Sequence, residues 1–458
     1  MTKHLKRSRV SKALIDAGLA PSFADAEARL DAVRVCVSVG DDQARTPAGQ
    51  AAALTALVTA YKCFGRVSLA IDAVETPLVA PLPIGRVLQD AARTVGATVG
   101  RQIPPGATHL VRVGAAKPWE GWSVHCWWDR WLAGTRATSP CASGDSRLAL
   151  SGVFAGALAV RQVFAALRAG PAYRAQDATV SLWEPWSEPD LTARGPSRFT
   201  APSDLWMVGL GHLGQAFVWN LLHLPYQEPR RAVLQDDQRI DDENEATSIL
   251  VGSDDIGTRK ARLAAGWLEP GGWETVLIER RHQGDIRPAA DDPPFLLCGL
   301  DALPPRKVLA QMGFDFMVDA GIGHGPADFE GIQVRVIPKG ASIERIWNAP
   351  TQEASNDRLL CTEAYQALER EIGACGSYTL ANASVAVPFV GAATGALAIA
   401  QLIRLASMRA GGALIQLELA APAMVIDGGR SSAPQGNLGG EPMDLDQFDV
   451  ALPVDPIV

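Results

Sequence analysis

We predict an α/β fold with two lobes from three features of the sequence. An apolar run ends in a glycine-rich turn and leads into a helical pattern, within residues 205–224. Two long apolar segments, 148–169 and 385–407, are similar to each other. Between them, residues 184–204 are rich in Pro, Ser and charge, which is the composition of a linker. With 458 residues, the chain is long enough for two or three domains that each bury a core.

The two apolar segments share a small-residue start, a Gly-Ala-Leu-Ala centre and an aliphatic end closed by Arg. Each predicts a helix that is apolar on nearly every face and therefore buried. A true repeat would make the protein two copies of one lobe, ending near Arg174 and near Arg409. Because buried helices in general have such compositions, an unrelated pair of helices stays open as the alternative.

The composition excludes several classes of protein. A net charge of −8 without a long basic run argues against a nucleic-acid partner. No run of about 18 uninterrupted apolar residues predicts a membrane span, and the basic start lacks the apolar segment of a signal peptide. The seven cysteines contain no Cys-x-x-Cys pair, so we expect a cytoplasmic protein without a disulfide framework or a structural zinc.

The predicted domain boundaries follow these composition changes. We expect a first lobe over 1–190, a linker over 191–202, a second lobe over 203–426 and a mobile Gly, Pro and Asp-rich tail over 427–458.

The first lobe has the elements of an α/β unit but no glycine loop. Residues 68–73 and 109–115 read as strands, and residues 85–97 read as a helix. We therefore predict a degenerate lobe without a nucleotide site.

The glycines of the second lobe have the spacing of a nucleotide phosphate loop. Gly209 makes the turn, Gly211 lets the backbone approach phosphate, and Gly214 lets the helix pack closely on the strand. This pattern alone names neither the nucleotide nor the reaction.

Polar residues follow the loop in a defined order. A short strand ends at Asp236, where an acidic residue can accept hydrogen bonds from ribose hydroxyls. Asn244 comes shortly afterwards, and Lys260 begins another helix. A second buried strand ends near Asp301, with Arg306 about one helical turn later.

This ordered series resembles the E1-like superfamily of adenylating enzymes, which includes the activators of ubiquitin-like proteins and the ThiF, MoeB and HesA proteins. The resemblance covers roughly residues 203–410. The end of that region, residues 375–405, is similar to the crossover and final helix of bacterial ThiF-like proteins. The resemblance implies two Rossmann-like lobes that form an intramolecular pseudo-dimer, with an inactive lobe preceding an active one.

The resemblance also implies ATP and Mg²⁺ as cofactors. Asp236 would hold the ribose, and Asn244 and Lys260 would engage the triphosphate. Asp301 would coordinate Mg²⁺, since a hard cation bridges carboxylate and phosphate oxygens. Arg306 would either orient the Asp301 segment or serve a structural purpose.

One position departs from the family pattern. The family usually has Arg three residues after the Asn, whereas this chain has Thr247. Arg259, beside the predicted triphosphate lysine, is one candidate for the missing cation. An Arg from the opposite lobe is another, which would implicate Arg7 or Arg9.

Many members of the family pass the activated acyl group to a cysteine, which requires an exposed thiol. Cys375 is the first candidate, in a predicted turn before the last buried helix. Cys361, at a predicted helix start, is the second choice. Cys298 lies in an apolar strand and reads as a core residue, and it is open whether either candidate is catalytic.

Three histidines fall in or near the motifs. We expect His212, in the glycine loop, to cap the helix or to face solvent, and we assign no function to His324. Together with His282 they show no metal-ligand spacing.

The resemblance implies an enzyme that adenylates the C-terminal carboxylate of a ubiquitin-like protein and passes it through a cysteine thioester to an E2-like partner. The closest alternative keeps the adenylation but acts on a sulfur carrier or a peptide, without a conjugation cascade. An NAD-dependent oxidoreductase would share the glycine loop but would leave Asn244, Lys260 and Asp301 unexplained. A non-catalytic scaffold is a further alternative, which Thr247 supports.

Overall fold

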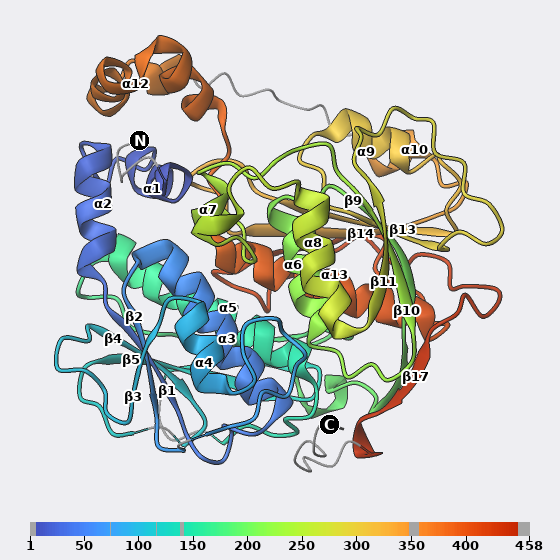
Figure 1. The fold of residues 1–458 in the computed structure, drawn as a ribbon, viewed down its shortest axis with the longest axis horizontal. Helices are drawn as coiled ribbons and strands as arrows, with labels where there is room; N and C mark the ends of the chain where they lie inside the picture. Colours follow the sequence, from blue (N-terminus) through green and yellow to red (C-terminus); the bar gives the residue numbers. More distant parts are fainter. Residues whose placement is uncertain (1–5, 74, 116, 138–141, 348–356, 448–458) are drawn as a thin grey trace.

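The computed structural model describes residues 6–447 except 74, 116, 138–141 and 348–356 (Figure 1). The chain forms two large sheets, each with helices packed on it, and a small third sheet. Both large sheets contain mainly parallel strands, so the predicted α/β class is confirmed.

The first large sheet has seven strands in the order β3-β2-β1-β4-β5-β6-β7. The strands are β1 (Val35–Val39), β2 (Val67–Ile71), β3 (Thr98–Gly100), β4 (His109–Val113), β5 (Trp122–Asp129), β6 (Leu132–Arg136) and β7 (Ala178–Ser181). Its helices are α3 (Pro47–Phe64), α4 (Leu88–Thr94) and α5 (Ala149–Ala169). The first five strands in this order, β3, β2, β1, β4 and β5, run parallel to one another. Strands β6 and β7 each run antiparallel to the strand before them in the order.

The second large sheet has eight strands in the order β11-β10-β9-β12-β13-β14-β15-β16. The strands are β9 (Asp204–Val208), β10 (Arg230–Gln235), β11 (Trp273–Ile278), β12 (Phe295–Cys298), β13 (Phe316–Ile322), β14 (Gly331–Pro338), β15 (Ile415–Glu418) and β16 (Val425–Asp427). The helices are α6 (His212–Leu222), α7 (Asn244–Thr247), α8 (Lys260–Leu268), α9 (Leu303–Leu309), α10 (Ile343–Ile346), α11 (Asp357–Leu360), α12 (Glu363–Asn382) and α13 (Pro388–Ala406).

The two sheets follow one plan. In each, four parallel strand pairings are followed by antiparallel ones, two in the first sheet and three in the second, and the strand order along the chain is the same up to β15. Helix α5 lies between β6 and β7 in the chain, and α13 lies between β14 and β15, so the two similar apolar segments occupy corresponding places.

The same two helices join the lobes. Glycines at four-residue spacing let each one approach a second helix: Gly152 and Gly156 lie against the α3 backbone, and Gly395 lies against the α6 backbone. A side chain at any of these glycines would collide with a carbonyl group. Helices α5 and α13 also pack on each other, as Figure 1 shows near the centre of the molecule.

Helices α5 and α13 are long and apolar enough to cross a membrane by length and composition. The structure buries 94% of the apolar window of α5 and all of that of α13 within the protein. In the described part of the chain, both helices are therefore core elements of the protein.

Two short helices precede the first sheet and contact the second lobe. Helix α1 (Ser8–Ile15) bears Lys12, whose Nζ pairs with Asp16 at 2.8 Å and donates to the Tyr365 hydroxyl at 2.7 Å. Tyr365 belongs to α12 and also meets Phe23 of α2 (Phe23–Ala32) edge to face. These contacts dock α12 on the N-terminal helices (Figure 1).

Part of the C-terminal tail pairs with a distant segment of the chain. Strand β17 (Glu441–Asp444) pairs antiparallel with β8 (Arg198–Ala201), so tail and predicted linker form a two-stranded sheet. The Gly and Pro-rich composition gave no sign of this pairing, because its partner strand is more than 200 residues away. Residues 448–458 lie outside the described part of the chain.

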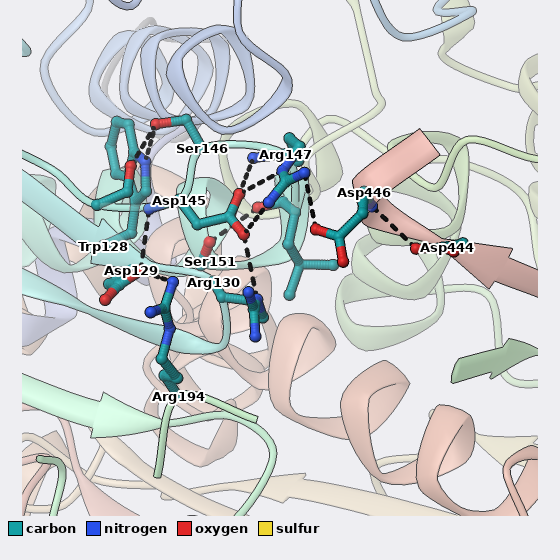
Figure 2. A network of polar contacts seen from close by, with 12 residues as sticks. Trp128, Asp129, Arg130, Asp145, Ser146, Arg147, Ser151, Arg194, Asp444 and Asp446 are labelled. Carbon is teal, nitrogen blue, oxygen red and sulfur yellow. Dashed lines mark hydrogen bonds and ion pairs between the residues drawn. The ribbon is translucent and has the colours of Figure 1, made fainter. Parts of the chain in front are cut away.

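A polar network attaches the tail to the first lobe (Figure 2). Asp145 accepts hydrogen bonds from Arg130 and Arg147, and Arg147 also pairs with Asp446 of the tail at 2.9 Å. Asp129 pairs with Arg194, in the predicted linker, at 3.0 Å. Lobe, linker and tail therefore meet at one group of charges.

The carboxylate of Asp145 should stabilise this junction in a pH-dependent way. Burial raises the pKa of Asp145, but hydrogen bonds from Arg147 and Arg130 outweigh burial and lower the pKa to about 2. A lowered folded-state pKa means that the stabilisation is complete above about pH 4 and is lost as the pH falls toward 2. We expect Asp145→Asn to reduce the free energy of unfolding by about 1–2 kcal/mol at pH 7.

Urea denaturation of both proteins between pH 3 and pH 7 measures this effect. The difference between wild type and variant should shrink toward pH 3. A difference that is constant over this range would show that Asp145 does not act through its charge.

Candidate functional site

The glycine loop takes the conformation that its sequence predicts. Gly209 follows β9 with a φ of +83°, a conformation that favours glycine. Gly214, in the first turns of α6, lies so close to the Gly209 carbonyl that a Cβ there would overlap it. Gly299, after β12, packs against the same carbonyl. The loop is therefore compressed between α6 and the end of β12, and Gly211 keeps open space toward the cleft.

A cleft of about 670 Å³ opens at the carboxyl ends of β9, β10 and β12. The predicted residues that line it are Gly209, Gly211, Asp236, Asn244, Lys260, Asp301 and Arg306. Gly214 lies beneath the loop, and Arg259 and both candidate cysteines are absent from the lining. Residues up to 97 positions apart in the sequence, from Gly209 to Arg306, thus meet at one site.

Asp236 fixes the shape of the loop. One of its carboxylate oxygens accepts a hydrogen bond from the Leu210 amide, and the other accepts one from the Gln238 amide, each at 2.7 Å. Its side chain therefore has a defined orientation at the end of β10.

Asn244 and Lys260 face the cleft as largely buried side chains, 8% and 7% exposed. The Asn244 side-chain oxygen accepts a hydrogen bond from the Asp241 amide at 3.1 Å. The Lys260 Nζ donates to the neutral Gln238 Oε1 at 2.7 Å. A lysine held by a neutral amide keeps its positive charge available for an anion.

Of the three arginines proposed to replace the cation missing at Thr247, the structure places Arg9 in the cleft. Its guanidinium donates to the Ser384 carbonyl at 3.0 Å and to the Ser384 hydroxyl at 2.6 Å. Arg7 points elsewhere, toward the carboxylates of α2. Arg259 is not a lining residue, although it donates to the carbonyl of Asp237, which is one.

Asp301 and Arg306 have different surroundings. Asp301 is exposed in the cleft just after β12. Arg306, on α9, forms two hydrogen bonds of 2.7 and 2.6 Å with Asp319, which is fully buried on β13. The guanidinium of Arg306 thus has a structural role that connects α9 to the sheet. Sequence reasoning missed Asp319, although an acidic residue in the middle of an apolar strand needs a partner.

His212 does not cap the helix, as one alternative had it, because its ring bonds to another segment; its side chain lies half-buried in the wall of the cleft. Burial lowers the pKa of His212 to about 4, and its ring is neutral at pH 7. Its Nδ1 donates to the Thr247 carbonyl and so ties α7 to the glycine loop. His324 and His282 also line the cleft. Among the described residues, no three His, Cys, Asp or Glu side chains could hold a metal ion together.

The candidate cysteines lie on the crossover segment. Cys375 is exposed and belongs to α12, where the sequence had predicted a turn. A turn does exist two residues earlier, because Gly373 breaks the helix with a φ of +81°. Cys361 is exposed just before α12. Cys298 is buried in β12, and burial raises the pKa of its thiol, as expected for a core residue.

Two parallel-rich sheets and a glycine loop at a strand end define the chain as a Rossmann-like α/β protein. Sequence models of two protein families match it: the BilD N-terminal domain over residues 34–182 and the BilD C-terminal domain over residues 201–409. The chain is also 33% identical, over 416 residues, to the bacterial E1-like protein BilD of Collimonas sp. (strain OK412), and the match covers 88% of each chain. The chain therefore belongs to the BilD family of E1-like proteins.

The two aspartates near the cleft should respond differently to substitution. Asp319→Ala leaves the buried Arg306 guanidinium without its partner, so we expect a loss of about 3 kcal/mol or more in the free energy of unfolding. The matched change Asp301→Ala affects an exposed carboxylate and should alter stability by less than about 0.5 kcal/mol. Thermal and urea unfolding measure both, and an equal loss in the two variants would contradict these assignments.

Proposed function

We propose that the protein activates the C-terminal carboxylate of a ubiquitin-like protein by ATP-dependent adenylation. The observation that most supports this is the convergence, in one cleft, of the glycine loop with Asp236, Asn244, Lys260 and Asp301. Membership of an E1-like family agrees with it.

The cleft suits the charge of a triphosphate. Gly211 presents backbone without a side chain, and Lys260 and Arg9 bring cationic groups whose hydrogen-bond partners are neutral. Asp236 stands at the strand end where a ribose would lie. In this scheme Arg9, from the N-terminal helix, supplies the cation that Thr247 does not.

Asp301 would hold Mg²⁺ together with phosphate oxygens and water, because the described residues offer no complete set of protein ligands there. The ion would neutralise charge on the phosphates. The exposure of Asp301 in the cleft is compatible with such a shared site.

The chemistry has two steps. The carboxylate oxygen of the carrier protein attacks the α-phosphorus of ATP, the bond to the β-phosphate oxygen breaks, and pyrophosphate leaves. Fixed cations stabilise the charge that develops on the phosphates. A cysteine thiolate then attacks the acyl carbon, AMP leaves, and a thioester remains for transfer to an E2-like partner in the cytoplasm.

Cys375 is our first choice for the thioester and Cys361 the second. Cys375 lies in the first turn of the helix that restarts after Gly373, where backbone amides favour an anion. The last residue of this helix, Asn382, and the segment 383–386 after it contribute four residues to the cleft lining. The crossover thus connects the thiol to the nucleotide site through a few residues.

We also propose that the first lobe is an inactive copy of the second, so that the chain forms a pseudo-dimer with one active site. In the second lobe three residues connect β9 to α6, whereas residues 40–46 connect β1 to α3. This longer connection contains Asp41 and Asp42, and Asp42 accepts a hydrogen bond from the Ala115 amide. Two carboxylates at this place would repel a polyphosphate.

One observation favours the alternative of adenylation without a thioester. Neither candidate cysteine lines the cleft, so adenylation of a sulfur carrier or a peptide could end with the acyl adenylate. The two proposals differ in whether a covalent adduct with the enzyme forms.

ATP–pyrophosphate exchange in the presence of a carrier protein tests the adenylation. We expect Lys260→Ala and Arg9→Ala each to lower kcat/KM for exchange by about 100-fold, since each removes a cation that faces the phosphates. Arg259→Ala is the matched control and should remain close to wild type. Exchange that depends on Arg259 and not on Arg9 would overturn the assignment of the cation.

The thioester is tested by a reducible covalent adduct between enzyme and carrier on non-reducing gels. Cys375→Ala should abolish the adduct and leave ATP–pyrophosphate exchange intact, whereas Cys361→Ala should retain both. An adduct that survives Cys375→Ala but not Cys361→Ala would identify the other thiol, and exchange without any adduct would favour the alternative function.

A further inference from the structure

A lysine of the first lobe donates hydrogen bonds to the segment that forms one wall of the cleft in the second lobe. Lys62 lies near the C-terminal end of α3 and is 7% exposed. Its Nζ donates to the Glu245 carbonyl at 2.7 Å and to the Val251 carbonyl at 2.6 Å. The two carbonyls belong to one segment, residues 244–251, that extends from α7 toward α8.

This segment borders the proposed nucleotide site. Asn244, Thr247 and Ser248 line the cleft, and they lie between or beside the two carbonyls that Lys62 holds. Helix α7 has only four residues, so its last carbonyl groups lack partners within the helix. Lys62 satisfies the Glu245 carbonyl, and His212 satisfies that of Thr247. Side chains from the first lobe and from the glycine loop therefore fix this short helix in place.

The hydrogen-bond partners of Lys62 explain why a charged side chain is buried there. Burial lowers the pKa of Lys62 to about 8, against the opposing effects of Glu245, Asp255 and Cys63, so the group is cationic at neutral pH. Within the described residues no carboxylate lies within 4 Å of it, so carbonyl oxygens take the place of a counter-ion. Hydrogen bonds from a charged donor are stronger than those between neutral groups.

A second, more exposed contact also joins the N-terminal part of the chain to the segment 244–251. Lys6, just before α1, pairs with the Glu245 carboxylate at 2.8 Å, with 39% of the Lys6 side chain exposed. Surface ion pairs contribute little on their own, so the buried Lys62 is the stronger of the two connections.

We propose that Lys62 is a positioning residue for the nucleotide site: the first lobe, which has no site of its own, holds the Asn244 segment of the second lobe in the geometry that binds ATP. This inference rests on the proposed function. The first lobe would then contribute to the site in a second way besides Arg9. Loss of Lys62 would leave residues 244–251 less firmly held, without removing any group that faces the ligand.

The test compares Lys62→Met, Lys62→Arg and wild type. Methionine keeps the apolar stem but cannot donate, and arginine restores a charged donor. Lys117→Met is the matched control, because Lys117 also lies in the first lobe and pairs with Asp72 of the same lobe. Thermal unfolding first establishes that each variant is folded.

Two measurements follow on the folded proteins: hydrogen exchange of the amides of residues 244–251 without nucleotide, and the KM and kcat for ATP in pyrophosphate exchange. Lys62→Met should speed amide exchange in this segment and raise KM for ATP about tenfold, with kcat less affected. Lys62→Arg should recover part of the loss, and Lys117→Met should match wild type in both.

Unchanged amide exchange in residues 244–251 of Lys62→Met, or faster exchange with an unchanged KM, would overturn the inference. If Lys62→Met does not fold, the same comparison between Lys62→Arg and wild type decides, since the larger, planar guanidinium cannot reproduce both ammonium contacts and must still shift both readouts. A wild-type protein that neither binds ATP nor exchanges pyrophosphate would refute the proposed function itself, and the role of Lys62 with it.

Discussion

The packing of α5 against α13 is the constraint on which the rest of the structure depends. Both helices consist of apolar and small residues, so neither can face water, and each is buried between its own sheet and the other lobe. Glycines at corresponding places bring α3 and α6 close to them, and the Trp219 indole of α6 donates to Thr55 of α3 at 2.9 Å. This core fixes the distance between the lobes. Only at that distance can α1 and α3 of the first lobe reach the cleft of the second.

The sequence predicted the parts of this architecture that depend on local patterns. The two apolar segments predicted the core helices, because a helix that is apolar on every face is stable in water only when it is buried. The glycine spacing gave the loop, and the strand-end positions of Asp236 and Asp301 placed both at one edge of the sheet. Those residues could be predicted because parallel strands bring their carboxyl ends together.

The features that sequence reasoning missed involve partners far apart in the chain. The pairing of β17 with β8 and the Lys62 contacts each join elements whose own sequences look ordinary. His212 was expected to cap the helix or to face solvent, and only its contacts with Thr247 of α7 and Gly391 of α13 show that it is half-buried and neutral. The choice of Arg9 over Arg7 likewise required the position of α2, whose carboxylates occupy Arg7.

The central claim is that the N-terminal part of the chain completes the nucleotide site of the second lobe. A crystal structure of the full chain with a non-hydrolysable ATP analogue and Mg²⁺ tests it most directly. We expect the triphosphate along Gly209–Gly211, with the Lys260 ammonium and the Arg9 guanidinium both within hydrogen-bond distance of its oxygens. A triphosphate bound there while Arg9 stays on Ser384, or an analogue bound outside this cleft, would contradict the account.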